Sequence, residues 1–292
     1  MKWEGQEQSD NVEDRRGEGG GGSSFGARHI GIGSVVIALL AGWLFGINPL
    51  TVLGLLDGGG SAVQTQTRTP APAQRPPAGD REAAFVSVVL RDTEQVWGQV
   101  FQAAGSRYED PKLVLFRGST PTACGTGQSA MGPFYCPGDR KVYLDLDFFD
   151  TLARRLGAPG QFAQAYVIAH EVGHHVQNLL GITNKVDALR VHETATQANA
   201  VSVRVELQAD CLAGVWANHS QQGKGWLEQG DIESALNAAA QIGDDTLQRD
   251  AGASVRPETF THGTSAQRVA WFRRGLDSGS VKQCNTFEAT RP

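Results

Sequence analysis

The chain has 292 residues, of which 40% are hydrophobic and 20% are charged, and its formal net charge is −5. These proportions are ordinary for a folded protein, so a large part of the chain can bury a core. The acidic balance and the lack of clustered Lys and Arg argue against a nucleic-acid partner, because binding to phosphates needs concentrated positive charge.

The first third of the sequence has the composition of a tail, a membrane span and a linker. Residues 1–28 are polar, charged and rich in glycine, so we expect a disordered N-terminal tail. Residues 30–56 hold 27 positions without a charged side chain. An unbroken helix of that length would extend roughly 40 Å, which is enough to cross a bilayer. We therefore expect a transmembrane anchor over residues 29–56, ended or kinked at Pro49.

A cleaved signal peptide is the alternative for this segment, but the segment starts late, is long, and is not followed by a clear small-residue cleavage site. Arg15, Arg16 and Arg28 precede the segment, whereas Asp57 follows it. Because positive charges favour the cytoplasmic side, we expect a single-pass protein of the inner membrane with its N-terminus inside. The domain that follows would then lie on the extracytoplasmic side.

The residues after the segment predict a linker and then a folded domain. Glycine and proline are frequent in residues 57–80, which is typical of a semi-extended linker. We expect the domain to occupy residues 81–292. It should open with a helix that ends near Gly105, because apolar residues recur there at helical spacing, namely Phe85, Val86, Val89, Val96 and Val100.

The rest of the domain divides into a short β-rich part and a longer helical part. Runs of β-forming residues separated by Gly and Pro predict a small antiparallel sheet from residues 113–116, 130–136 and 141–146. Later residues predict helices over 161–180, 193–218, 231–240 and 264–276. The expected fold class is therefore α+β, mainly helical with a small antiparallel sheet, preceded by one transmembrane helix.

The four cysteines all follow the apolar segment, which fits two disulfides in an oxidising compartment. The spacing suggests that Cys124 pairs with Cys136 in a local loop, leaving Cys211 to pair with Cys284. Four buried thiols in a reduced protein are the alternative, because cysteine is among the most buried residue types. A zinc site built from cysteines is not expected, since the sequence has no CxxC pair.

A metal-binding pattern occurs in the predicted helix 161–180, where His170 and His174 enclose Glu171 in an HExxH motif. Positions i and i+4 share a helix face, so both imidazoles can reach one ion. Glu171 would lie beside that ion as a general base. Zinc lowers the pKa of a bound water toward about 7, and the carboxylate then accepts its proton as the water attacks a carbonyl.

The third ligand decides which kind of site this is. A metzincin would have a glycine three residues after the second histidine and a further histidine three residues beyond it, but Gln177 and Leu180 stand there. Glu206 and Asp210 instead form an ExxxD pattern in a helical stretch. Glu206 would complete a His₂Glu zinc site, and Asp210 would accept the free N–H of a ligand histidine. A solvated helix face is the alternative for both carboxylates.

Further candidates are His262, at the start of the last predicted helix, and Arg268, one turn into it. His262 could stabilise the oxyanion of a tetrahedral intermediate, and Arg268 could orient His262 or a carboxylate ligand. A loop histidine beside an N-cap threonine is the alternative. His175 points about 100° away from His174 and is expected to be structural or solvent-facing rather than part of the site. Residues 130–136 could form an edge strand that binds an extended peptide, or a structural hairpin.

Taken together, these residues resemble a known bacterial family, the putative neutral zinc metallopeptidases. The segments that carry the resemblance are residues 9–16 (SDNVEDRR), the apolar span, residues 124–136, 170–177 (HEVGHHVQ), 206–211 (ELQADC) and 260–268 (FTHGTSAQR). The resemblance covers most of the chain. It implies a membrane-anchored protein with a zincin-like catalytic domain, and it says little about the substrate.

The function that we expect is that of a membrane-anchored zinc metallopeptidase, with a protein or peptide as its substrate and Zn²⁺ as its cofactor. The alternative is a non-catalytic, zinc-stabilised module that binds peptides at the cell envelope. Every position that hydrolysis needs is present, which favours the enzyme. The oligomeric state is not predicted.

Overall fold

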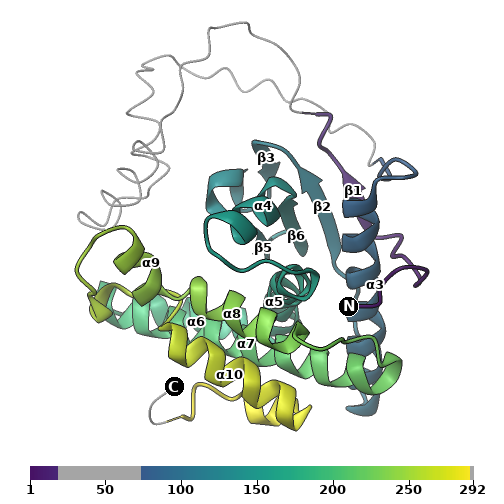
Figure 1. The fold of residues 1–292 in the computed structure, drawn as a ribbon. Coiled ribbons are helices and arrows are strands. Elements are labelled where there is room, and N and C mark those ends of the chain that lie inside the picture. Colours follow the sequence, from purple (N-terminus) through teal and green to yellow (C-terminus); the bar gives the residue numbers. More distant parts are fainter. Residues whose placement is uncertain (19–73, 290–292) are drawn as a thin grey trace, which may run out of the picture. The chain divides into compact units, whose positions relative to one another are not determined.

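Helix α5 (Gln161–Leu179) is the central element of the computed structural model, which describes residues 1–18 and 74–289. Within these residues, a four-stranded sheet lies on one side of α5 and the long helix α7 (Ala195–Lys224) lies on the other (Figure 1). Helix α10 (Ser265–Ser278) packs along α7, and α3 (Arg81–Ala103) contacts α5 and α7. The expected α+β class, mainly helical with a small sheet, is confirmed.

The opening helix of the predicted domain is α3. Asp80 caps its first turn, since the Asp80 carboxylate accepts a hydrogen bond from the backbone N–H of Ala83 at 3.0 Å. The apolar positions that predicted this helix are largely buried, with Phe85, Val86 and Val89 each at most 3% exposed. The helix therefore contributes one continuous apolar face to the core.

The sheet is mixed rather than antiparallel, so the predicted pairing is wrong. The strand order is β1 (Val12–Asp14), β2 (Lys112–Phe116), β6 (Lys141–Asp145) and β5 (Phe134–Cys136). The first three strands are parallel, and only β5 runs antiparallel to β6. Four consecutive residues of β2 and of β6 are buried, a pattern that parallel strands covered on both faces commonly show. A hairpin of β3 (Ser119–Thr122) and β4 (Gly125–Gln128) lies between β2 and β5 in the chain.

The N-terminal residues belong to this domain, so the predicted disordered tail is wrong for residues 1–18. β1 pairs with β2 in register from Val12 opposite Leu113. The Trp3 ring packs edge-on against Phe85, with 5.4 Å between ring centroids. The prediction rests on the average composition of the segment, which is polar, and the few residues that pair with β2 do not change that average. Residues 19–28, the predicted anchor and residues 57–73 of the predicted linker lie outside the described residues.

Glu13 fixes β1 to its neighbours through three cations. Its carboxylate, only 8% exposed, lies 2.7 Å from Arg15, 3.1 Å from Lys112 and 2.9 Å from Lys141. Burial by itself would raise the pKa of Glu13, but hydrogen bonds from the three cations lower it from 4.5 to about 2. The carboxylate therefore stays ionised and bridges β1, β2 and β6.

The helical part follows the predicted positions, with the helices longer or shorter by a few residues. Helices α5, α7, α8 (Asp231–Gln241) and α10 correspond to the four predicted ones, and α7 extends to Lys224 rather than residue 218. Short helices that the pattern did not predict are α4 (Asp147–Arg154), α6 (Ile182–Arg190), α9 (Asp244–Asp250) and the 3₁₀ turns η1 (Ser129–Met131), η2 (Pro257–Thr259) and η3 (Val281–Cys284).

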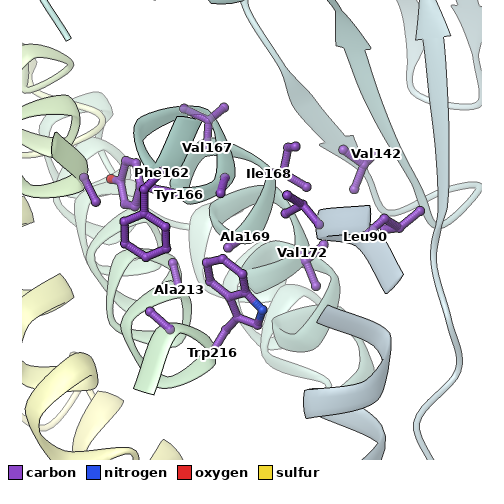
Figure 2. Packing of buried hydrophobic residues seen from close by; sticks show 14 of the residues in the cluster. Leu90, Val142, Phe162, Tyr166, Val167, Ile168, Ala169, Val172, Ala213 and Trp216 are labelled. Atoms are coloured by element: carbon purple, nitrogen blue, oxygen red, sulfur yellow. The ribbon is translucent and has the colours of Figure 1, made fainter. Parts of the chain in front are cut away.

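Both faces of α5 are buried, which explains why its sequence is apolar nearly all round. One face packs on α7, where Phe162 stacks on Trp216 with 5.9 Å between ring centroids. Figure 2 shows this contact, and it shows Ile168 and Val172 turned toward Val142 of β6 and Leu90 of α3. The helix with the HExxH motif is thereby held from two sides.

Glycines allow the backbones of α5, α7 and α10 to approach one another closely. A Cβ at Gly173 of α5 would lie 3.0 Å from the backbone oxygen of Ala209 in α7. Between α7 and α10 the contact is closer still, since a Cβ at Gly275 would lie 1.9 Å from the Cys211 backbone oxygen. A larger residue at either position would push α7 away from its neighbour.

Two disulfides join the cysteines as the spacing suggested, Cys124 with Cys136 and Cys211 with Cys284. All four cysteines of the chain are therefore paired, and the alternative of buried thiols is wrong. The first disulfide joins the turn between β3 and β4 to the end of β5. The second ties α7 to η3 near the C-terminus. Among residues 1–18 and 74–289, no helix has the length and apolar character needed to cross a bilayer.

The ion pairs of Glu13 with Arg15, Lys112 and Lys141, called the Glu13 clamp below, make the stability of the domain sensitive to acid. We expect Glu13→Gln to lower the free energy of unfolding by about 1–3 kcal/mol near pH 7, because three cations lose their shared partner. Glu13 has a lowered pKa, so its contribution is present above pH 4.5 and is lost as the pH falls toward about 2. Chemical unfolding of the purified chain at several pH values measures this difference.

Glu4→Gln is the matched control, because Glu4 pairs with Arg81 where both side chains are more than two-thirds exposed. Its effect should stay within about 0.5 kcal/mol. A Glu13→Gln effect of the same size as Glu4→Gln, or one that persists at pH 2, would contradict the clamp.

Candidate metal centre

Two neighbouring helices bring together the three predicted ligands. His170 and His174 lie one turn apart on α5 and face Glu206 on α7. The Nε2 atom of His170 is 3.1 Å from one Glu206 carboxylate oxygen, and Nε2 of His174 is 3.5 Å from the other. One donor atom from each residue lies within 4.8 Å of the others.

These donors fit a zinc ion. Zinc prefers tetrahedral sites of imidazole nitrogen and carboxylate oxygen at about 2.0–2.1 Å, which places neighbouring donor atoms about 3.3 Å apart. The distances of 3.1 and 3.5 Å, each to a different oxygen of Glu206, are close to that value. Two imidazoles and one carboxylate leave a fourth position, as catalytic zinc sites do and closed structural sites do not.

A buried network holds His170 from behind. Its Nδ1 atom lies 2.9 Å from Oδ1 of Asp210, a residue with no exposed surface. Arg268 of α10 donates from Nε to Oδ2 at 2.9 Å and from Nη2 to Oδ1 at 3.0 Å. The Tyr166 hydroxyl donates to the same Oδ1 at 2.5 Å. Asp210 therefore joins α5, α7 and α10 through one carboxylate.

The charges in this network fix the protonation of His170. Burial would raise the pKa of Asp210, but the Arg268 guanidinium beside it keeps that pKa lowered, so the carboxylate is ionised. Burial would lower the pKa of His170, whereas the Asp210 charge and its hydrogen bond raise it to about 10. The imidazolium form, with Nδ1 donating to Asp210 and Nε2 donating to Glu206, is therefore favoured without a metal ion. A metal ion at Nε2 would replace the proton there, while the Asp210 carboxylate keeps the proton on Nδ1.

His174 has a second support that the sequence did not identify, Gln177. Nδ1 of His174 lies 2.8 Å from the Gln177 side-chain oxygen, which can only accept its proton. The Gln177 amide donates to the Val205 carbonyl at 2.7 Å and to Gln208 at 3.0 Å. Gln208 in turn donates to the carbonyl of Cys284 at 2.9 Å. A signal was available, because Gln177 lies three positions after His174 and so shares its helix face.

Glu171, the acid within the HExxH motif, has a carboxylate that takes no part in the hydrogen-bond network described above. The residue is 8% exposed. In the parts of the chain that the structure describes, its carboxylate makes no hydrogen bond and no ion pair, whereas Glu206 and Asp210 both have partners. Glu171 follows His170 directly on α5, within the same helical turns as both candidate ligand histidines. A proton acceptor is thus available beside the metal position.

His262 lies at the rim of the site, in the loop before α10. Asp244, which the sequence did not identify, holds its Nδ1 atom at 3.1 Å, and the His262 side chain is 49% exposed. The adjacent Gly263 has φ of +92°, and a Cβ there would lie 3.2 Å from Val203 on the turn of α7 that precedes Glu206. Burial would lower the pKa of His262, but Asp244 and the Glu206 charge raise it.

Arg268 does not reach His262, since its guanidinium is fully engaged in the network around Asp210. In the described residues Arg268 pairs with a carboxylate, but not with that of the candidate ligand Glu206, so its contact differs from both predicted roles. The carboxylate is Asp210, which holds a ligand histidine, rather than a ligand itself.

His175 is structural, as predicted. It has no exposed surface, and its Nε2 donates to the Glu109 carbonyl at 2.7 Å. Its Nδ1 therefore accepts from the Tyr135 hydroxyl at 3.0 Å. Tyr135 belongs to β5, which lies at the edge of the sheet next to β6. His175 thus connects the edge strand to the helix that carries the ligands.

Comparisons with known proteins agree with the residues at this site. A family model described as "Putative neutral zinc metallopeptidase" matches residues 1–287. The chain is 52% identical over 293 residues to "Uncharacterized protein YpfJ" of Escherichia coli strain K12, covering 98% of this chain and 99% of that protein. It is 45% identical over 192 residues to "Uncharacterized protein Rv2575" of Mycobacterium tuberculosis strain H37Rv, covering 62% and 64%. No solved structure matches the chain.

The support from Gln177 can be tested by zinc affinity. We expect Gln177→Ala to weaken zinc binding about 10- to 100-fold, because the His174 ring loses the partner that fixes its orientation. Competition with a chelator of known affinity measures the change on the purified chain.

Gln222→Ala is the control, since Gln222 lies on the exposed part of α7 and bonds only to Asn218 in the described residues. That variant should bind zinc like the wild type. Equal affinity in Gln177→Ala and Gln222→Ala would show that His174 does not depend on this partner.

Proposed function

This chain belongs to the putative neutral zinc metallopeptidase family, and we propose that it is a zinc-dependent enzyme that hydrolyses peptide bonds in a protein or peptide substrate. One observation carries the proposal. Glu171 holds a carboxylate that makes no hydrogen bond or ion pair within the described residues, beside three side chains whose donor atoms could surround a metal ion. A site that only stabilised the fold would have no need of this further carboxylate next to its donors.

Zinc held by His170, His174 and Glu206 would supply a Lewis acid that lowers the pKa of water toward about 7. Glu171 then acts as the general base. Its free carboxylate accepts the proton of the water that attacks the substrate carbonyl, and later delivers the proton to the leaving amine. Glu206 is not available for this step, because both of its oxygens face the ligand histidines.

His262 is suited to stabilise the oxygen of the attacked carbonyl as negative charge develops on it. Asp244 holds Nδ1, and the exposed ring leaves Nε2 free in the described structure to donate a hydrogen bond. The raised pKa of His262 favours a ring that has a proton to donate at Nε2. A donor positioned in advance contributes to catalysis because it need not reorganise during the reaction.

We place this activity outside the cytoplasm. The two disulfides support an oxidising compartment, since structural disulfides are rare in proteins that remain in the cytoplasm. The substrate class follows from the reaction, and the residues around the site do not define a sequence preference.

The role of Glu171 is tested by Glu171→Gln in the full-length chain. We expect one zinc per chain in both proteins and a loss of at least about 100-fold in hydrolysis of unfolded casein, because only the base is removed. Metal analysis and the release of labelled peptides measure the two quantities.

Glu193→Gln is the control, since Glu193 lies in the exposed turn before α7. It should retain full activity. Bound zinc without hydrolysis in the wild type would favour the non-catalytic peptide-binding module, and full activity in Glu171→Gln would exclude Glu171 as the base.

If His262 stabilises the developing oxyanion, its removal should affect kcat more than KM. His262→Ala should retain zinc but lower kcat about 100- to 1000-fold with little change in KM, because the lost hydrogen bond forms only as charge develops. Steady-state kinetics on a fluorogenic peptide distinguishes the two constants. Loss of zinc from His262→Ala, or a rise in KM at constant kcat, would argue for a ligand or a binding role instead.

A further inference from the structure

The two flanks of residues 19–73 lie side by side in one domain. The backbone N–H of Asp14 donates to the carbonyl of Gln74 at 2.7 Å, and the two residues form an antiparallel bridge. The chain thus leaves the domain after β1 and returns next to it. Residues 1–18 and the residues from 74 onward are part of the same compact unit.

The N-terminal flank is bound along its length to α3 as well as to β2. Ser9 and Asn11 both donate to Oε1 of Glu94 in α3, at 2.6 and 2.9 Å. Ser9 also exchanges two hydrogen bonds with Ser87, backbone N–H to carbonyl at 3.0 Å and hydroxyl to carbonyl at 2.9 Å. Ser9, Ser87 and Glu94 are all less than 9% exposed, so separating them would leave buried polar groups unpaired.

We propose that residues 1–18 and 74–289 occupy the same side of any membrane, so that the chain between them does not make a single crossing. A chain whose two flanks share one compartment crosses a bilayer an even number of times. The apolar stretch of residues 30–56 has 27 positions, and two helical crossings need about 40. One complete crossing would require β1 to leave the sheet.

Two of the three arginines that favoured a cytoplasmic N-terminus, Arg15 and Arg16, have a different explanation in this fold, and Arg28 lies outside the described residues. Arg15 pairs with Glu13, and Arg16 pairs with Asp14 at 2.6 Å and with Asp80 at 2.7 Å. Both arginine side chains are less than one-fifth exposed. Their positive charges stabilise the domain and are neutralised there, so they are no evidence for orientation in a membrane. The two disulfides support an oxidising compartment for the domain, and in this proposal the N-terminal flank shares that compartment.

Accessibility of one cysteine on each flank tests this topology. Asp10 and Ala78 are both exposed, and the native cysteines are all paired, so Asp10→Cys and Ala78→Cys each add one reactive thiol to the full-length chain. Spheroplasts of Escherichia coli expressing either variant are treated with a membrane-impermeant maleimide before and after lysis. We expect both variants to react before lysis, to extents equal within about twofold. A variant that reacts only after lysis while the other reacts before it would overturn the proposal.

A second experiment tests the contact itself, without reference to a membrane. Residues opposite each other in an antiparallel bridge have Cα atoms about 4.5–5.5 Å apart, which suits a disulfide. The double variant Asp14→Cys with Gln74→Cys should therefore form a cross-link that peptide mass mapping detects in membranes isolated under oxidising conditions. Asp14→Cys with Ser278→Cys, at the exposed end of α10, is the control and should not form one. Absence of the first cross-link in protein that holds both native disulfides would overturn the proposal.

Discussion

The ion pair between Asp210 and Arg268 is the interaction on which the candidate metal centre depends. Asp210 has no exposed surface and Arg268 has 2%, so neither charge can be solvated if the other moves away. Breaking a buried pair by moving one partner costs several kcal/mol, because the remaining charge is left uncompensated. The pair therefore fixes α10 against α7. Through Tyr166 and His170, the same carboxylate fixes α5 as well.

Close helix packing makes this pair possible. Gly275 of α10 lies against the backbone of Cys211, the residue next to Asp210, and Gly173 of α5 lies against Ala209 on the other side. A glycine within a helix costs roughly 1 kcal/mol relative to alanine. Here the cost is offset by bringing three helix backbones within reach of one carboxylate. The ligands thus obtain their geometry from backbone contacts several ångströms behind them, and not from the metal alone.

The parts predicted from the sequence are those that a local pattern determines. HExxH and ExxxD fix their residues one turn apart on a helix, so the ligand set and Asp210 could be found without knowledge of the fold. The strand directions of the mixed sheet could not be predicted in this way, because they depend on pairing between distant segments of the chain. The one local sign that β2 and β6 are parallel is their continuous burial. Asp244 and the N-terminal strand were missed for the same reason. Asp244 meets His262 from another helix, and β1 is a short strand within a polar segment.

β1 also has a consequence for the time at which the domain is completed. Glu13 is made early, but its partner Lys141 follows 128 positions later. At a synthesis rate of about 5–20 residues per second, the strand waits roughly 6 to 26 s for that partner. The backbone partner of β1 in the sheet is β2, with Glu13 opposite Val114, so the N-terminal flank is not committed to the sheet until β2 has been made. Completion of the sheet is therefore a late event in biosynthesis, because it waits for both β2 and β6.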